Sequence, residues 1–176
     1  MPIVYRELAD ALDVDVGDVA ALASVREAVL RLRARKGMVI DPHDPDSVSV
    51  GSFFTNPIVT AAELDAVARR AGGTPPAFPE PDGRVKTSAA WLVERAGFRR
   101  GYGHGRVGIS TKHTLALVNR GGGTARELVA LALEIAAGVR EAFGIALVPE
   151  PVLVGIDWPE DFSNPSVRAT SRAARR

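Results

Sequence analysis

Apolar residues recur at helical spacing in two long segments of the chain. In residues 24–36 they share one face of a predicted helix, and in residues 124–143 they form a longer stripe that runs from Leu128 to Val139. Both helices are expected to end at a glycine, because Gly37 and Gly144 follow the last periodic residues. Shorter helices are predicted over residues 5–12, 60–71 and 88–97.

Capping signals mark the start of three of these helices. Thr60 with Glu63, and Thr124 with Glu127, have the three-residue spacing of a capping box. Ser88 is a suitable N-cap for the helix that follows it. The starts of these three helices are therefore marked in the sequence by a capping residue.

Strands are predicted over residues 48–54, 84–86, 115–118 and 147–154. Residues 41–46 and 72–82 are rich in proline, glycine or aspartate, so they are predicted to be loops, and the glycine-rich residues 99–108 are expected to be too flexible for a regular element. The mixture indicates an α+β fold, with helices packed on one face of a small mixed or antiparallel sheet.

Length and composition restrict the function classes. At 176 residues the chain fits one domain, expected over residues 1–157, followed by an extension over residues 158–176 whose basic end is expected to be disordered. Without cysteine there is no disulfide framework and no thiolate metal site, which suits a cytoplasmic protein. A net charge of +1, no secretory signal and no apolar run long enough for a membrane predict no nucleic-acid partner and no membrane.

A few residues have a ligand-binding interpretation beside a simpler structural one. Gly121–Gly123, ahead of a helix, would suit a phosphate, but a tight strand-to-helix turn explains them better. His43, His104 and His113 are too dispersed to predict a metal site. His104 either contacts a nucleotide or is exposed in its loop. Lys112 and His113 either lie near a substrate or pack at a strand edge.

The segment Gly51-Ser52-Phe53-Phe54-Thr55-Asn56-Pro57 is more informative. Gly51 would let the backbone approach a ligand, and the two phenylalanines would pack the loop down, so that Ser52 and Asn56 are held in place. A strand leaving a turn is the alternative interpretation. Far downstream, residues 149–155 place Glu150 between two prolines at the head of an apolar run.

Together these segments resemble the C-terminal, substrate-binding domain of UDP-N-acetylenolpyruvoylglucosamine reductase, the MurB-type flavoenzyme of peptidoglycan synthesis. Residues 88–97 look like the helix that this family has here, and residues 110–121 look like the strand that follows it. The four pieces occur in the family's order, and the likeness runs from about Tyr5 to Gly155. The flavin-binding part that should precede this domain is not found in the chain.

The resemblance implies reduction of UDP-N-acetylglucosamine enolpyruvate to UDP-N-acetylmuramate, with NADPH reducing FAD and the flavin passing a hydride to the vinyl carbon. The neighbouring carbon must then be protonated while charge on the substrate carboxylate is stabilised. Ser52 is implied to be the proton donor. Glu150 is implied to be the acid at the carboxylate, and its apolar neighbours would raise its pKa. Asn56 and Lys36, which ends a helix ahead of Asp41-Pro42, are implied to orient the substrate.

Two interpretations of the chain as a whole remain open. It is either a fragment or separately encoded half of the reductase, inactive until a flavin-binding domain joins it, or a stand-alone module that binds a UDP-sugar or a partner and keeps relic catalytic residues. In both cases neither FAD nor NADPH is expected to bind the isolated chain tightly. Thr55 stands where the family often has lysine, so no contact of that lysine is carried over.

Overall fold

The computed structural model describes residues 2–103, 105–159 and 162. Within this part the chain forms five α-helices, one short 3-10 helix and six short strands. The helices are α1 (Arg6–Leu12), α2 (Leu22–Arg35), α3 (Ala61–Ala71), α4 (Ala89–Arg95) and α5 (Ala125–Phe143), and the 3-10 helix is η1 (Pro45–Ser47). The strands are β1 (Ser49–Ser52), β2 (Ile58–Val59), β3 (Ala77–Pro79), β4 (Val85–Thr87), β5 (Val107–Ile109) and β6 (Ala116–Asn119).

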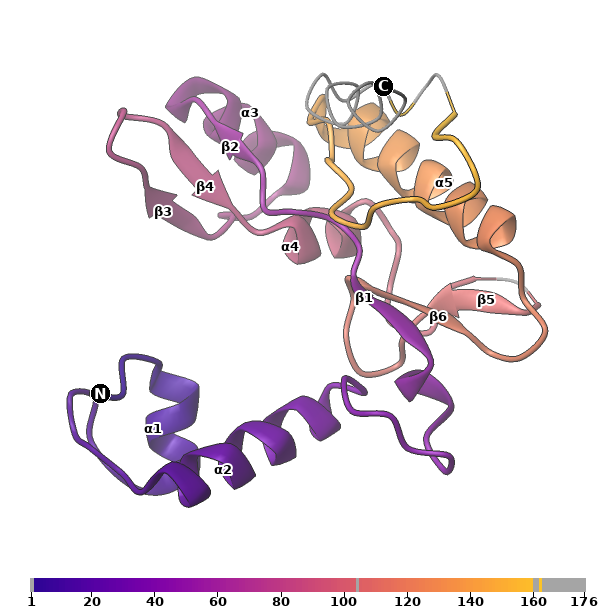
Figure 1. Ribbon diagram of the computed structural model, residues 1–176. Coiled ribbons are helices and arrows are strands. Elements are labelled where there is room, and N and C mark those ends of the chain that lie inside the picture. The colour runs from indigo at the N-terminus through magenta and orange to yellow at the C-terminus, as the bar shows by residue number, and fades with distance from the viewer. Residues whose placement is uncertain (1, 104, 160–161, 163–176) are drawn as a thin grey trace, which may run out of the picture.

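The strands form two separate antiparallel sheets of three strands each, in the orders β1-β6-β5 and β2-β4-β3. Figure 1 shows β1 leading from the first sheet towards the second, with α5 above the sheet of β5 and β6. The predicted α+β class and the antiparallel pairing are confirmed. The strands belong to two sheets, whereas the sequence pattern had suggested one.

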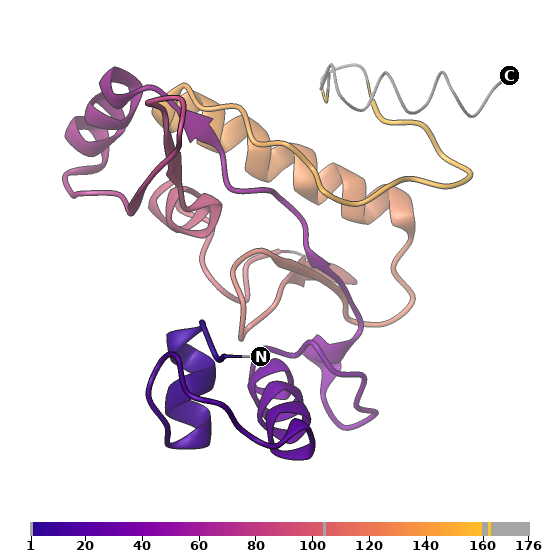
Figure 2. The same cartoon turned by 60° about the vertical axis from the view of Figure 1, so that its left-hand side comes forward.

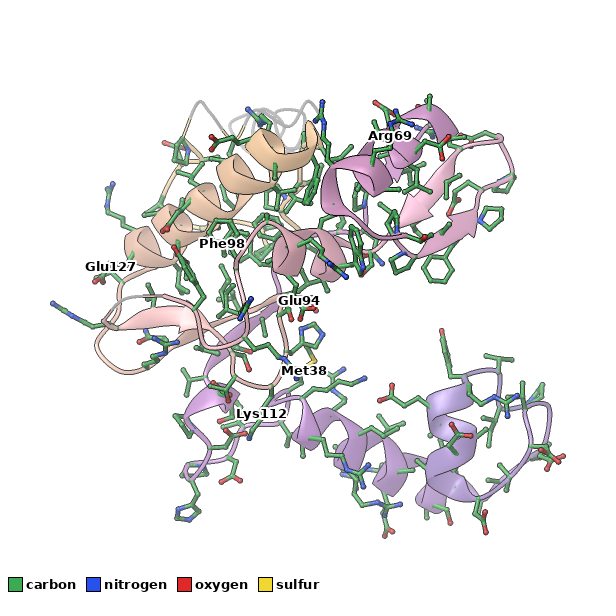
Figure 3. All side chains as sticks on the ribbon, turned by 180° about the vertical axis from the view of Figure 1, so that it is seen from behind. Met38, Arg69, Glu94, Phe98, Lys112 and Glu127 are labelled. Atoms are coloured by element: carbon green, nitrogen blue, oxygen red, sulfur yellow. The ribbon has the colours of Figure 1, made fainter. Side chains whose placement is uncertain are left out.

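The longest helix, α5, organises the hydrophobic core. It buries eight residues and packs against α3, α4, β5 and β6. Gly138 in its middle is needed for this packing, because a Cβ atom there would lie 2.5 Å from a ring carbon of Phe98. Figure 3 shows Phe98 beside this helix. The capping boxes at Thr60 and Thr124 are both formed, so the starts of α3 and α5 are as predicted.

Three strand predictions were wrong in detail. Residues 147–154 do not form a strand: their one ladder contact is an isolated bridge between Phe54 and Pro149, because Pro149 and Pro151 have no N–H to donate. Conversely, β3 lies in the segment predicted to be a loop, and β5 overlaps the segment judged too flexible. Each has only three residues, too few to show a period of two.

The two N-terminal helices stand apart from the rest of the described chain. Figures 1 and 2, viewed from different sides, both show α1 and α2 packed on each other and joined to the body through the segment that leads into β1. Each of them buries one residue, Ala9 in α1 and Ala28 in α2. Of the face predicted for α2, Val25 is half-buried, but Val29 is 37% exposed.

Two aromatic residues near the C-terminal end of the described chain belong to the core. Trp158 packs against it and Phe162 is buried, both against aromatic residues that follow β1. The expected disordered basic end falls on residues 163–176, which lie outside the described residues, as does His104. Among the described residues, no helix has the length and apolar character needed to cross a membrane.

Candidate active site

A cavity of about 640 Å³ lies where the end of α2 meets β1. Its wall combines residues from two distant parts of the sequence, 33–52 and 150–151, and includes both expected catalytic residues, Ser52 and Glu150. The other lining residues are Arg33, Met38, Ile40, Ser47, Ser49, Val50, Gly51 and Pro151. The two sequence segments singled out for their unusual composition therefore form one site.

Backbone hydrogen bonds fix the two segments to each other. The N–H of Glu150 donates to the carbonyl of Phe53 at 2.8 Å, and the N–H of Thr55 donates to the carbonyl of Val148 at 3.0 Å. On the other side, the N–H of Phe53 donates to the carbonyl of Leu115 at 2.8 Å, which connects the segment to the residue directly before β6. Glu150 is thus held next to Ser52 by the main chain, independently of side-chain rotamers.

Gly51 places an irregularity in β1 directly before Ser52. Ser49 pairs with Val118 and Ser52 pairs with Ala116, so β1 has one residue more than β6 between these pairs. Gly51 adopts φ 71°, a left-handed conformation that favours glycine, as in the glycine type of β-bulge. A bulge of this kind reorients the side chain that follows it, here Ser52.

Buried aromatic rings hold the segment after Ser52, as expected from the sequence. Phe53 and Phe54 are 2% and 3% exposed, with ring centroids 5.2 Å apart in an edge-to-face arrangement. Trp158 packs edge-to-face on Phe53 at 6.1 Å, and Phe162 stacks on Phe54 at 6.3 Å. Because both phenylalanines are anchored, the backbone of Ser52 is fixed relative to the core.

The two catalytic candidates differ in exposure. Ser52 is half-buried, whereas Glu150 is exposed. The burial expected from the apolar neighbours of Glu150 is therefore not supplied by the described residues. Any desolvation of its carboxylate would have to come from a bound substrate or a partner that covers the cavity.

The two residues expected to orient the substrate, Lys36 and Asn56, lie outside the described lining of the cavity. The Lys36 ammonium pairs with Glu7 of α1 at 2.8 Å, at an exposed position. The side-chain oxygen of Asn56 accepts a hydrogen bond of 2.9 Å from the N–H of Ala89, at the start of α4. Lys36 thus links the end of α2 to α1, and Asn56 links the segment after β1 to the start of α4.

Arg33 supplies a cationic group in the cavity that the sequence analysis missed. It precedes Lys36 by three residues, and residues three apart lie on the same side of a helix. Spacing alone does not single it out among the arginines of α2, because its place in the cavity depends on how α2 meets β1. A guanidinium there suits an anionic group such as a phosphate or a carboxylate.

Lys112 connects the loop between α2 and β1 to the body. The Lys112 ammonium pairs with Asp44 at 2.7 Å, and this hydrogen bond lowers the pKa of the Asp44 carboxyl. Figure 3 shows Lys112 and Met38 at the junction of α2 and β1. His113 is half-buried, and its Nδ1 accepts from the N–H of Leu115 at 3.1 Å. Burial, followed by the charge of Lys36, lowers the pKa of His113.

The other candidate sites show structural contacts. The Asn119 side-chain oxygen accepts hydrogen bonds of 3.0 Å from the N–H groups of Gly121 and Gly123, so this glycine turn is closed by Asn119. That observation agrees with the tight-turn interpretation. The described residues contain no group of three or more histidine or acidic side chains placed to hold a metal ion.

Comparison with known proteins gives consistent matches. Residues 42–154 match the family model described as UDP-N-acetylenolpyruvoylglucosamine reductase, C-terminal domain. A protein named UDP-N-acetylenolpyruvoylglucosamine reductase from Thermobifida fusca is 61% identical over 161 residues, which cover 88% of this chain and 45% of the relative. Proteins of the same name from Streptomyces coelicolor and Mycobacterium tuberculosis are 58% and 54% identical, over 42% and 43% of their lengths. The chain thus spans somewhat less than half the length of these relatives.

Proposed function

This chain belongs to the UDP-N-acetylenolpyruvoylglucosamine reductase family, and we propose that it forms the substrate-binding half of an enzyme that reduces UDP-N-acetylglucosamine enolpyruvate to UDP-N-acetylmuramate in peptidoglycan synthesis. The observation that carries the proposal is the cavity in which Ser52 and Glu150 meet. Its lining offers a hydroxyl, a carboxyl and a guanidinium, which are a proton donor, an acid and an anion-binding group.

FAD and NADPH are implied by the family. The one turn that suggested a phosphate cradle, Gly121–Gly123, is closed by Asn119. We therefore assign both cofactors to the part of the relatives that this chain does not span. The residues described here are assigned to the substrate and to its proton.

Reduction of an enolpyruvyl ether adds a hydride to one vinyl carbon and a proton to the other. In the proposed reaction the Ser52 hydroxyl gives its proton to the carbon beside the carboxylate, on which negative charge develops. Glu150 in its acid form donates a hydrogen bond to that carboxylate and stabilises the same charge. The bulge at Gly51 and the anchored Phe53 fix the hydroxyl in position, which reduces the entropy lost in reaching the transition state.

Lys36 and Asn56 are proposed to orient the substrate from outside the cavity. The ion pair between Lys36 and Glu7 is exposed, with side chains 40% and 58% accessible, so an anionic substrate can compete with it at little cost. Asn56 would present its amide nitrogen to the substrate while its oxygen remains bonded to Ala89. Arg33 would bind an anionic group inside the cavity.

Reconstitution tests the proposal. The part of the Thermobifida fusca relative that precedes the region matched by this chain would be produced with FAD and combined with it. We expect NADPH oxidation that depends on UDP-N-acetylglucosamine enolpyruvate and requires both chains. If the enolpyruvyl substrate binds the chain but no combination oxidises NADPH, the alternative of a stand-alone UDP-sugar binding module is favoured.

A further inference from the structure

The 3-10 helix η1 lies between α2 and β1 and contains two buried polar residues. Helix α2 packs chiefly on α1, whereas η1 packs on β6, in the body of the protein. Asp46 and Ser47 of η1 are each only 6% exposed. Polar side chains in a connecting segment normally face water, and those that are buried have hydrogen-bond partners. The partners of these two residues therefore show how α2 is joined to the body.

The Asp46 carboxyl group is bonded to a residue that is far away in the sequence. Its Oδ2 accepts a hydrogen bond of 3.0 Å from the N–H of Thr111 and another of 2.5 Å from the Thr111 hydroxyl. Thr111 lies in the turn between β5 and β6. Burying a carboxyl group is costly unless hydrogen bonds replace its hydration, so these bonds hold η1 at one place on the turn.

A second connection lies beside the first. Asp44 is the N-cap of η1, and its Oδ1 accepts from the N–H of Asp46 at 3.1 Å. The Oδ2 of Asp44 pairs with the Lys112 ammonium at 2.7 Å, and the Asp44 side chain is 13% exposed. Two acids of the η1 region are thus bonded to two successive residues of the β5–β6 turn. We call Asp44, Asp46, Thr111 and Lys112 the η1 anchor.

The segment that leaves α2 packs directly on η1. Gly37 follows the helix with φ 67°, and a Cβ atom there would lie 3.1 Å from the Cβ of Asp46 and 3.2 Å from its carbonyl oxygen. Further along, the Ser47 hydroxyl accepts from the N–H of Asp41 at 3.0 Å and donates to the Asp41 carbonyl at 2.9 Å. The segment is therefore held against η1 at two points.

The η1 anchor connects two parts of the cavity wall. Three lining residues come from α2 and the segment after it: Arg33, Met38 and Ile40. Ser52 lines the cavity from β1, whose partner β6 follows the turn that carries Thr111. Figure 3 shows Met38 and Lys112 at this junction. The placement of the three α2-side residues relative to Ser52 therefore depends on the bonds between η1 and the turn.

We propose that Asp46 is a positioning residue of the candidate active site, which fixes the α2 side of the cavity relative to Ser52 through its bonds to Thr111; its effect on turnover rests on the proposed function. Asp46 lies outside the described lining of the cavity and so acts through the wall that it holds. A wall that is already in place need not be ordered when the substrate binds, which favours binding. Loss of the bonds should weaken substrate binding, whereas Ser52, held by the aromatic core, should keep its rate.

Kinetics of the reconstituted enzyme test this role. Asp46→Ala removes both bonds to Thr111 and should raise KM for UDP-N-acetylglucosamine enolpyruvate about tenfold, with kcat within about threefold of the normal value. Asp46→Asn keeps an oxygen that can accept from Thr111, so its KM should stay within about threefold of normal. A defect of folding alone would lower kcat by reducing the amount of active enzyme and would leave KM unchanged, and that result would overturn the proposal.

Asp82→Ala is the matched control for this series. Asp82 lies in the turn between β3 and β4 and accepts the same two kinds of hydrogen bond, from the N–H of Arg84 at 3.1 Å and from its side chain at 2.8 Å. It is outside the described lining of the cavity, and its replacement should leave KM and kcat within about twofold of normal. A rise in KM equal to that of Asp46→Ala would contradict a specific role of Asp46.

Hydrogen exchange of the chain alone makes the test independent of turnover. In Asp46→Ala the amides of Met38 and Asp41, which donate to Arg33 and Ser47, should exchange at least about tenfold faster, while amides of α5 keep their protection. Loss of protection in α5 would show that Asp46→Ala does not fold. Thr111→Val, which removes only the hydroxyl bond, then replaces it and should change exchange and KM in the same direction.

Unchanged exchange at Met38 and Asp41 in a folded variant would overturn the proposal. If exchange rises as expected but no reconstituted enzyme turns over, with the unmodified chain included, the proposed function is contradicted. The placement of the α2 side of the cavity by Asp46 would then still stand.

Discussion

The main-chain N–H of Glu150 donates a hydrogen bond to the carbonyl of Phe53, the residue after Ser52, at a distance of 2.8 Å. This backbone bond joins the segment that carries Ser52 to the segment that carries Glu150. Because Phe53 is also buried against Trp158, a change in the aromatic cluster would move Ser52 and Glu150 together.

The first prediction concerns the chain after Gly155. A chain that ends at Phe162 should melt as the full-length protein does, whereas a chain that ends at Gly155 should lose several degrees. The second truncation removes the rings of Trp158 and Phe162 from Phe53 and Phe54, and loss of a buried aromatic side chain typically costs about 3–5 kcal/mol. Differential scanning calorimetry of the three chains makes the comparison. Equal melting temperatures for all three would show that the aromatic contacts contribute nothing.

The second prediction concerns FAD. The isolated chain should retain no flavin after mixing with excess FAD and desalting, because its glycine turn is already closed by Asn119. The visible absorption spectrum of the desalted protein measures this. A flavin band at near-stoichiometric level would contradict the assignment of the cofactor to the remaining part of the relatives.

The third prediction concerns pH. Burial and the charge of Lys36 lower the pKa of His113, so the folded protein takes up this proton at a lower pH than the unfolded chain does. Below the ordinary histidine value of about 6.5, the unfolded state binds more protons, and stability therefore falls as the pH is lowered. The melting temperature of the native protein should drop between about pH 6.5 and 5, and His113→Gln should reduce that drop.

His43→Gln is the matched control for this series, because the His43 side chain is exposed. Hydrogen bonds from Thr60 and Thr124 are the chief cause of the lowered pKa values of the Glu63 and Glu127 carboxyls. Their contribution to the stability of the protein is lost only as the pH falls below the ordinary glutamate pKa of 4.5, which is outside this window. An unchanged pH profile in His113→Gln would show that the burial of His113 has no effect on stability.

The elements that were predicted correctly depend on local signals. The capping box at Thr124 and the apolar stripe of α5 are complete within one helix, so no tertiary information was needed to place them. The strand predicted over residues 147–154 failed because Pro149 and Pro151 have no N–H to donate, so only an isolated bridge forms at Pro149. Leu147 is buried in the core, whereas Val152 and Val154 are exposed, and the hydrophobic pattern of the segment did not show this.

The lining of the cavity was predicted in part. Ser52 and Glu150 were singled out by their neighbours and by a family resemblance, and the structure brings them to one cavity. Arg33 could not be chosen from several similar arginines in α2, because its place in the cavity depends on how α2 meets β1. The backbone hydrogen bond between Glu150 and Phe53 is likewise a long-range contact with no local signal.

The fourth prediction concerns Ser52 as the proton donor. In the reconstituted enzyme, Ser52→Ala should lower turnover by about 10² to 10⁴-fold, the range typical of general acid catalysis, with a much smaller change in KM. Glu150→Gln should act in the same direction but more mildly, because the amide keeps a hydrogen-bond donor. Ser24→Ala is the control, since Ser24 is an exposed serine of α2 outside the lining of the cavity.

Stopped-flow measurement of the two half-reactions in Ser52→Ala tests the central claim most directly. Reduction of the flavin by NADPH does not use the substrate's proton and should proceed at the normal rate. Reoxidation of the reduced flavin by UDP-N-acetylglucosamine enolpyruvate should slow by at least about 10²-fold, and Ser24→Ala should leave it nearly unchanged. Reoxidation at the normal rate in Ser52→Ala would contradict the account, and the segment after β1 would then serve only to pack the core.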